Sequence, residues 1–336
     1  MAGQGHGTKA VVAALLANAG IAAAKFIGFL ITRSGSMLAE SVHSVADAGN
    51  QALLLLGGHR AKRVPSREHP FGYGRERYFW AFVVAIILFS LGGMFAIYEG
   101  IEKLRHPHEI ESVTVAIVIL SVGIVLEAFS FRTAIVESNK VKDPQLSWWA
   151  FVRRSKNPEL PVVLLEDLAA QLGLVLALVA VTVAEITGEP RWDGAGTLAI
   201  GVLLVVIAVI LAIEMKGLLI GESASLSDQQ KIVAAIEVEP SVKRLIHMRT
   251  QHLGPDELLV GAKIELIPDL SVTEAAEAVN RIEASVRRAV PTARVMYLEP
   301  DVFRTVVPSD EPAHLAGAPG AAAESAGDSV AAADPG

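Results

Sequence analysis

The sequence predicts an α-helical membrane protein with six transmembrane helices, followed by a small α+β domain. Three observations lead to this fold class. The 336 residues are 52% hydrophobic and 19% charged, a lower charged share than in an average soluble protein. Uncharged apolar runs recur through the first 220 residues, and the pattern then changes to the shorter periodicities of a soluble domain.

Six apolar runs are long enough to span a bilayer, which takes about 20 apolar residues in a helix. Polar residues inside these runs, such as Asn18 and Lys25, are tolerated where they face protein rather than lipid. The end of the fourth run is the least defined, because it continues into FRTAIVESNK. We expect the spans at residues 8–31, 37–58, 78–101, 113–136, 160–186 and 194–220.

The charges between the spans predict how the protein is oriented. The connection between the second and third spans carries a net charge of +4, and that between the fourth and fifth carries +2. The connections after the third and fifth spans each carry −1. Because cytoplasmic loops are enriched in Lys and Arg, both termini should be cytoplasmic.

Residues 223–304 predict a dimerising α+β domain in the order helix, strand, strand, helix, strand. The predicted helices are 227–238 and 272–289, and the predicted strands are 242–252, 258–266 and 294–299. Two helices would cover one face of a three-stranded sheet and leave the other face for a second copy. Residues 305–336 hold five acids and no Lys or Arg in an Ala/Gly/Pro-rich context, which predicts a disordered tail. The predicted domains are therefore 1–222, 223–304 and 305–336.

Composition also excludes several classes of site. The chain has no cysteine, so disulfides and thiolate metal sites are absent and a metal site must use imidazole and carboxylate groups. There is no basic stripe that would indicate nucleic-acid binding. No arrangement of nucleophile, base and oxyanion donors is visible, and we do not expect an enzyme or a permanently bound cofactor.

The second span carries the first candidate metal-binding pair. His43 and Asp47 are four residues apart, so they lie on one helix face, separated by a rise of about 6 Å. Glu40, Ser44 and Asn50 flank the same face. An imidazole and a carboxylate so placed can share a divalent cation. A central charge costs roughly 2.5–3.5 kcal/mol to insert, which favours a function in ion transport over a purely structural polar face.

The fifth span carries the second candidate pair, Glu166 and Asp167. Adjacent residues on a helix differ by about 100°, so both can serve one site only if the helix is locally distorted. One of them could instead pair with Lys25 in the first span. In the fourth span, Glu127 is expected to pair with Arg132 near the cytoplasmic end.

Two stretches carry a resemblance to a known family. SGSMLAESVHSVADAGNQALLLLG and the following HPFGYGRERYFW resemble the second helix and loop of the cation diffusion facilitator transporters. The resemblance covers residues 9–300, and VVLLEDLAAQLG is most similar to the branch of the zinc transporter 9 type proteins. It implies a homodimer with six membrane helices and a ferredoxin-like, metallochaperone-like cytoplasmic domain that exchanges divalent metal, usually zinc, for protons.

The resemblance also implies a ligand set, with one departure. The family's sites use two pairs spaced four residues apart, and the first pair corresponds to His43 and Asp47. In the fifth span the family aspartate falls on Asp167, but its partner falls on Val163, which cannot bind metal. The other register places Glu166 at the partner position and leaves Ala170 for the aspartate. We therefore expect metal at His43, Asp47 and Asp167, with Glu166 as the substitute ligand.

In the C-terminal domain, relatives often carry metal-binding histidines on the strands. Here Lys263 and Tyr297 occupy such positions and only His247 remains, so we expect weak or no metal binding.

The sequence thus favours a transporter that exports a divalent metal ion, zinc in the first instance, by proton-coupled alternating access. Its partners would be the metal ion as substrate, protons, the lipid bilayer, expected to be the inner cell membrane, and a second copy of the chain. Two alternatives stay open. One is a transporter of the same family for manganese, iron or cobalt. The other is a non-transporting, metal-sensing scaffold, which the Val163 gap allows.

Overall fold

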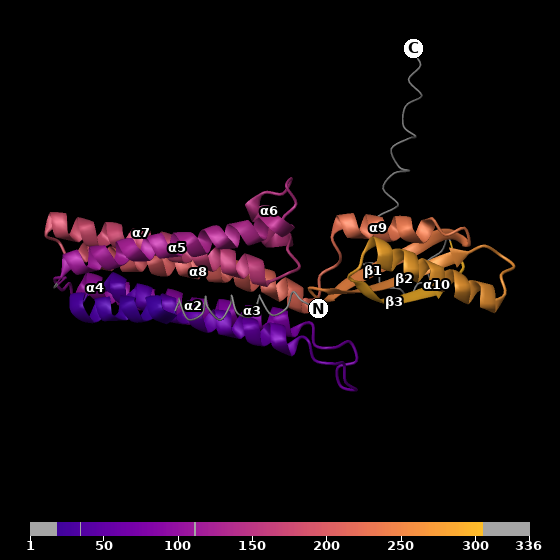
Figure 1. The fold of residues 1–336 in the computed structure, drawn as a ribbon, viewed down its shortest axis with the longest axis horizontal. Helices are drawn as coiled ribbons and strands as arrows, with labels where there is room; N and C mark the ends of the chain where they lie inside the picture. Colours follow the sequence, from indigo (N-terminus) through magenta and orange to yellow (C-terminus); the bar gives the residue numbers. More distant parts are fainter. Residues whose placement is uncertain (1–18, 34, 111, 305–336) are drawn as a thin grey trace, which may run out of the picture. The chain divides into compact units, whose positions relative to one another are not determined.

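The protein consists of two compact units, with the main division between Glu222 and Ser223 (Figure 1). The computed structural model describes residues 19–33, 35–110 and 112–304, without the side chains of Ser36, Ala39, Glu40 and His43. The predicted tail 305–336 and the beginning of the first predicted span therefore lie outside the described residues, as does the imidazole of His43.

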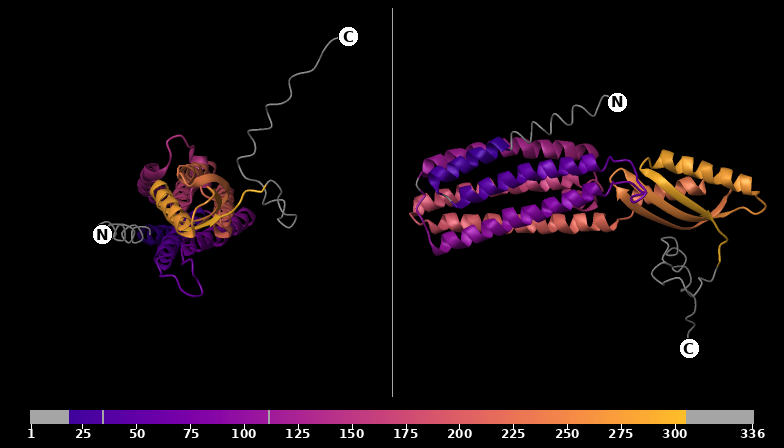
Figure 2. Two further views of the ribbon diagram at one scale, coloured as in Figure 1. Left: turned by 90° about the vertical axis from the view of Figure 1, so that its right-hand side faces the viewer. Right: turned by 90° about the horizontal axis from the view of Figure 1, so that it is seen from below.

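The first unit is built from long helices that run side by side (Figures 1 and 2). They are a helix at Ala19–Thr32, α2 (Gly35–Arg60), α3 (Glu76–Ile87), η1 (Leu88–Met94), α4 (Phe95–Arg105), α5 (Val113–Val141), the short α6 (Trp148–Arg154), α7 (Glu159–Thr187) and α8 (Arg191–Ile220). These elements correspond in order to the six predicted spans.

Four helices of the described part are long and apolar enough to cross a membrane: Glu76–Arg105, Val113–Val141, Glu159–Thr187 and Arg191–Ile220. The helix Ala19–Thr32 is apolar but has a shorter described length. Helix α2 has 26 residues, enough to span a bilayer, but its polar residues lower its hydropathy. The fold class is confirmed, whereas the count of six spans stays a prediction.

The described helices extend beyond several predicted limits. The fourth span, predicted to end at residue 136, continues to Val141, because the polar segment after Arg132 keeps its helical backbone. The third span is one continuous rod from Glu76 to Arg105, interrupted by a π-helical stretch at Leu88–Met94. The pattern of apolar residues could not indicate this stretch, since π-helical turns occur inside otherwise regular helices.

Glycines allow α4 and α8 to pack backbone against backbone. A Cβ added to Gly100 would lie 2.6 Å from Leu198 N, and one added to Gly201 would lie 2.6 Å from Ile97 N. Both are far inside van der Waals contact, so glycine is required where these helices meet.

Helix α7 is the most buried of the four apolar spans. It packs against α2, α5 and α8. Because it is apolar on nearly all sides, its polar residues must face other helices rather than lipid. This position makes α7 the helix on which a site inside the unit can be built.

The second unit is an α+β domain, as predicted. Its elements are α9 (Leu226–Glu237), β1 (Val242–Gly254), β2 (Glu257–Leu266), α10 (Val272–Ala289) and β3 (Ala293–Pro300). The sheet order is β1-β2-β3, with β2 and β3 parallel. Ser225 caps α9, and a capping box formed by Ser271 and Glu274 begins α10.

The core of the second unit lies on one face of its sheet. The alternate β2 residues Leu258, Val260, Ala262 and Ile264 are buried, as their spacing predicts. They form one cluster with apolar residues of both helices, Ile232 and Ile236 from α9 and Ile282 and Val286 from α10. Both helices therefore cover the same face.

Candidate functional site

The candidate site lies between α2 and α7, inside the helical unit. Helix α2 provides Asp47 and Asn50, and α7 provides Glu166 and Asp167. All four are buried, with exposed fractions of 9%, 0%, 4% and 7%. Burying four polar side chains in an apolar helical unit costs free energy. Polar and ionisable residues kept inside membrane segments despite this cost mark functional sites.

The two adjacent acids of α7 turn toward different helices. Asn50 Nδ2 of α2 donates a hydrogen bond of 2.6 Å to Glu166 Oε1. Ser130 Oγ of α5 donates one of 3.0 Å to Asp167 Oδ2. Helix α7 is a regular α-helix through both positions. The local distortion expected if both acids were to serve one site is therefore not present, because each acid uses its own neighbouring helix.

The carboxyl groups form one electrostatic cluster. Among the described charged residues, Asp47 interacts most strongly with Glu166, and also with Glu127, Lys25 and Asp167. Glu166 and Asp167 also interact with each other. The structure thus brings Asp47, Glu166 and Asp167 into one neighbourhood, in which the hydrogen-bond donors to the two α7 acids are neutral.

Lys25 does not pair with Glu166 or Asp167, the two acids considered as its partners from the sequence. Its ammonium group donates 2.7 Å to Ser44 Oγ and lies 3.8 Å from Glu127 Oε1. The expected pair of Glu127 with Arg132 is therefore wrong, since Glu127 is buried next to Lys25 whereas Arg132 is exposed. The lysine has its ion pair with α5 rather than with the acids of α7.

The three predicted ligands with described side chains, Asp47, Glu166 and Asp167, do not form a metal site by themselves in this structure. In the described part of the chain, no three His, Asp or Glu side chains are close enough together to hold a metal ion. The imidazole of His43 is outside that part, although its backbone lies on α2 one turn before Asp47. A cation bound by all four predicted ligands would require side chains of α2 and α7 to move closer together.

Two residues of the cluster were not singled out as site residues from the sequence. Asn50 was noted only as a neighbour on the polar face of α2. Ser130 follows Glu127 by three residues on α5, and this spacing places both on one helix face. That spacing is the signal by which Ser130 could have been found.

The HPFGYG segment after α2 forms a loop whose residues contact one another. The backbone N–H of His69 donates to Ser66 Oγ at 3.1 Å, and the rings of His69 and Tyr73 lie 4.6 Å apart. Gly72 has a φ of +78°, a conformation that residues with a side chain rarely adopt. The exposed His69 therefore has a structural explanation within this loop.

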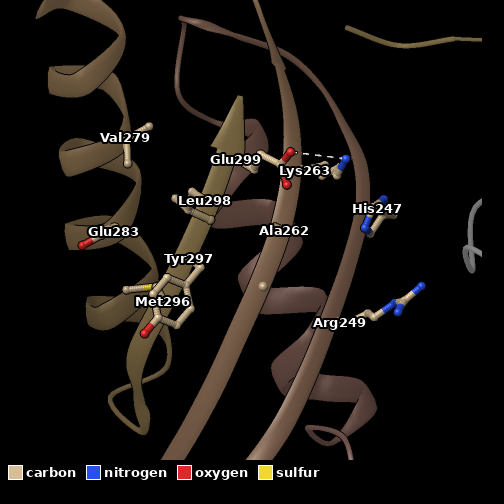
Figure 3. A pocket seen from close by; sticks show the side chains of 11 residues that line it. His247, Arg249, Ala262, Lys263, Val279, Glu283, Met296, Tyr297, Leu298 and Glu299 are labelled. Atoms are coloured by element: carbon tan, nitrogen blue, oxygen red, sulfur yellow. Dashed lines mark ion pairs between the residues drawn. The ribbon is translucent and has the colours of Figure 1, made fainter. Parts of the chain in front are cut away.

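A hollow lies on the sheet of the α+β unit and has a volume of about 510 Å³ (Figure 3). Its lining includes His247 and Arg249 of β1, Gly261 and Lys263 of β2, and Tyr297 and Glu299 of β3. Lys263 Nζ lies 3.3 Å from Glu299 Oε1 and 3.1 Å from Asp301 Oδ2.

The ammonium group of Lys263 pairs with both carboxylates beside this hollow. Hydrogen bonds to the carboxylates of Asp301, the larger cause, and Glu299 raise the pKa of Lys263 above its ordinary value of 10.5. Both nearby carboxylates are thus already paired with a positive charge.

Comparisons with known proteins match both units. The model of the cation efflux transmembrane domain matches residues 11–220, and that of the cation efflux protein cytoplasmic domain matches residues 225–297. A nickel form of a MamM C-terminal domain aligns with 24% of this chain and all of that chain, at 22% identity and a TM-score of 0.23.

Curated relatives align with most of the chain. The proton-coupled zinc antiporter SLC30A9, mitochondrial, of Xenopus laevis is 34% identical over 242 residues, which cover 72% of this chain and 43% of the relative. The human protein of the same name is 31% identical over the same shares. Metal tolerance protein C4 of Arabidopsis thaliana is 30% identical, over 77% of this chain and 57% of its own length. The chain thus spans less than half the length of the SLC30A9 proteins that it matches. Together, the domain matches over both units and these relatives show that the chain belongs to the cation diffusion facilitator family of metal transporters, in the branch of SLC30A9.

Proposed function

We propose that the chain exports zinc from the cytoplasm by exchange for protons, with a substrate site between α2 and α7. One observation carries the proposal: the buried acids Asp47, Glu166 and Asp167 form one cluster inside the membrane unit of a cation-efflux protein. In the described part of the chain, neither Glu166 nor Asp167 forms an ion pair with Lys or Arg; their hydrogen-bond donors are the neutral side chains of Asn50 and Ser130. A divalent cation would neutralise this negative charge.

The chemistry of the donors fits zinc as substrate. His43 would supply an imidazole nitrogen, and Asp47, Asp167 and Glu166 would supply oxygens, which makes four ligands. A set dominated by oxygen also accepts manganese, iron or cobalt. The names of the SLC30A9 relatives, proton-coupled zinc antiporters, favour zinc among these ions.

Proton exchange follows from the same donors. Imidazole and carboxylate bind either a metal ion or a proton, so metal binding releases protons and protonation releases metal. His43 also belongs to the residue type whose ordinary pKa is near neutrality. Alternating access of one site would then couple the two fluxes in opposite directions.

Sidedness and assembly complete the proposal. The basic connections support a cytoplasmic position of both termini, and the α+β unit would hold two protomers together as a homodimer. We place the protein in the inner membrane of a cell. The relatives named as mitochondrial make an organelle membrane the alternative location.

The experiment is zinc flux into proteoliposomes with an imposed pH gradient. We expect the flux in the wild type to depend on the gradient, and Asp47→Asn to abolish it. Glu185→Gln is the control, because Glu185 is an exposed acid on α7. Equal flux in the Asp47 variant and the wild type would show that the site is wrong.

A metal-sensing scaffold is the second candidate function. The lack of convergence among the described ligands favours it, together with Val163 at a family ligand position. This candidate predicts stoichiometric zinc binding by purified protein without zinc flux in vesicles.

A further inference from the structure

Asn50 is the amide that connects α2 to the acids of α7. It follows Asp47 by three residues and therefore lies on nearly the same face of α2, about one turn closer to Arg60. Its side chain is fully buried. The 2.6 Å hydrogen bond to Glu166 Oε1 joins the two helices at this level.

The hydrogen bond also shows how the amide group of Asn50 is oriented. Its NH₂ group faces Glu166 and donates to Glu166 Oε1. Its Oδ1 then points away from Glu166. This oxygen is buried, and no group of the described residues donates a hydrogen bond to it.

A buried acceptor without a hydrogen bond lowers the stability of the folded protein. A buried polar group without a partner costs roughly 1–3 kcal/mol, and such groups in native proteins call for an explanation. Leu or Ala at position 50 would avoid this cost. Asn50 Oδ1 is thus a buried acceptor without a donor among the described residues, on a side chain that contacts an acid of the proposed site.

Two other buried amide oxygens, Gln51 Oε1 and Gln171 Oε1, also lack a hydrogen-bond partner among the described residues. They follow Asp47 and Asp167, respectively, by one helical turn. Neither is hydrogen-bonded to a predicted ligand in the described structure, whereas Asn50 is. Of these three amides, Asn50 is therefore the one whose side chain contacts an acid of the proposed site directly.

We propose that Asn50 Oδ1 is a ligand of the transported divalent cation and, with Glu166, supplies the coordination that Val163 cannot. This inference rests on the proposed function, because it adds a residue to the same site. A further neutral carbonyl oxygen beside the carboxylates makes the set of ligands harder in the chemical sense. Asn50 thereby makes the site more permissive for manganese relative to zinc.

The absence of cysteine from the chain allows a direct test. In the variant Asn50→Cys, the introduced thiol is the only one in the protein, and thiolate binds soft Cd²⁺ strongly. We expect Cd²⁺ added to this purified, full-length variant to produce the ultraviolet charge-transfer band of a cadmium–thiolate bond at one equivalent. Asn139→Cys is the control, because Asn139 is exposed on α5 and far along the chain from the proposed ligands.

The flux of the same variant should change in selectivity. In proteoliposomes, we expect Asn50→Cys to raise the ratio of cadmium to manganese flux at least tenfold over the wild type. If Asn50→Cys gives no more band than the Asn139→Cys control and leaves this ratio unchanged, Asn50 is not a ligand.

A second pair of variants separates ligation from the positioning of Glu166, and serves if Asn50→Cys does not fold. Asn50→Asp keeps an oxygen but loses the NH₂ donor, and Asn50→Ala loses both. A ligand role predicts that Asn50→Asp binds manganese within about tenfold of the wild type, while Asn50→Ala binds it at least tenfold more weakly. Equal losses in both variants would assign Asn50 to positioning alone and overturn the inference.

Wild-type controls separate this inference from the proposed function. If the wild type exchanges zinc for protons and Asn50→Cys shows no cadmium signal, the inference fails and the transport proposal stands. If the cadmium band forms but the wild type moves no zinc, transport fails and the ligand assignment stands.

Discussion

Lys25 lies 3.8 Å from Glu127, and both side chains are almost completely buried, with exposed fractions of 2% and 8%. The pair joins the helix Ala19–Thr32 to α5 inside the membrane unit. The lysine ammonium also donates to Ser44 of α2, so one cation connects three helices. Removing one partner would leave the other charge buried without its ion pair.

We therefore predict that Lys25→Met lowers the free energy of unfolding by about 3 kcal/mol, the usual cost of breaking a buried pair. The double variant Lys25→Met with Glu127→Gln should recover most of this loss. Thermal unfolding in detergent would measure both. A double variant less stable than Lys25→Met alone would contradict this account of the pair.

The acids of α7 should differ in their effect on zinc affinity. We expect Asp167 to occupy the family's aspartate register, and the neutral amide of Asn50 donates a hydrogen bond to Glu166. We predict that Asp167→Asn abolishes zinc flux, and that Glu166→Gln lowers zinc affinity at least tenfold but leaves measurable flux.

Isothermal titration with zinc and flux assays on the same preparations would compare the two variants. Glu185→Gln should match the wild type in both. The reverse order of damage would make Glu166 the principal ligand of α7 and Asp167 its auxiliary.

The close packing of α4 on α8 predicts a large effect from a small substitution. In Gly100→Ala the new methyl group would lie 2.6 Å from Leu198 N, so the helices must separate. We expect a loss of about 1–3 kcal/mol, the usual range for overpacking.

Gly49→Ala on α2 is the matched control, since an added Cβ there meets nothing within 4 Å. Alanine favours the helix over glycine, so this variant should be as stable as the wild type or slightly more stable. Equal melting temperatures for Gly100→Ala and Gly49→Ala would show that α4 and α8 are not closely packed.

The α+β unit should show a pH-dependent contact between Glu239 and Arg281. Arg281 Nη2 donates to Glu239 Oε1 at 2.8 Å, and hydrogen bonds with Arg281 are the main cause that lowers the pKa of Glu239. The contact therefore contributes stability above the ordinary pKa of 4.5, and this contribution is lost as the pH falls through the lower pKa of the folded state.

Hydrogen-exchange protection factors for the amides of α10 should therefore decrease in acid in the full-length protein. In Glu239→Gln, we expect lower protection at neutral pH and a smaller decrease in acid. The same acid decrease in the variant and the wild type would rule out this pair as the titrating contact.

The sequence was informative where one physical signal dominated. Alternation along residues 258–266 predicts one covered face made of Leu258, Val260, Ala262, Ile264 and Leu266, because a strand with one covered face must alternate. The first four are buried, whereas Leu266, at the end of β2, is only partly buried. The four-residue spacing of His43 and Asp47 indicated a polar face on α2, and Asp47 lies buried in the cluster with the acids of α7.

Contacts between distant helices were less predictable. Nothing in local spacing determines that Lys25 lies beside Glu127, or that Asn50 reaches Glu166 across 116 residues of chain. From the sequence, Glu166 and Asp167 could face one site only if the helix were distorted. In the structure Glu166 contacts α2 and Asp167 contacts α5. Such pairings depend on which helices pack together, which hydrophobic periodicity does not specify.

Zinc-driven proton movement tests the central claim most directly. Vesicles containing the wild type, with an acidic lumen, would receive external zinc while a zinc dye and a pH dye report from inside. We predict that zinc enters as luminal protons leave, several times faster than without the gradient, and that Asp47→Asn abolishes both signals. Zinc entry that is independent of the gradient, or equal in the Asp47 variant, would contradict proton-coupled transport through this site.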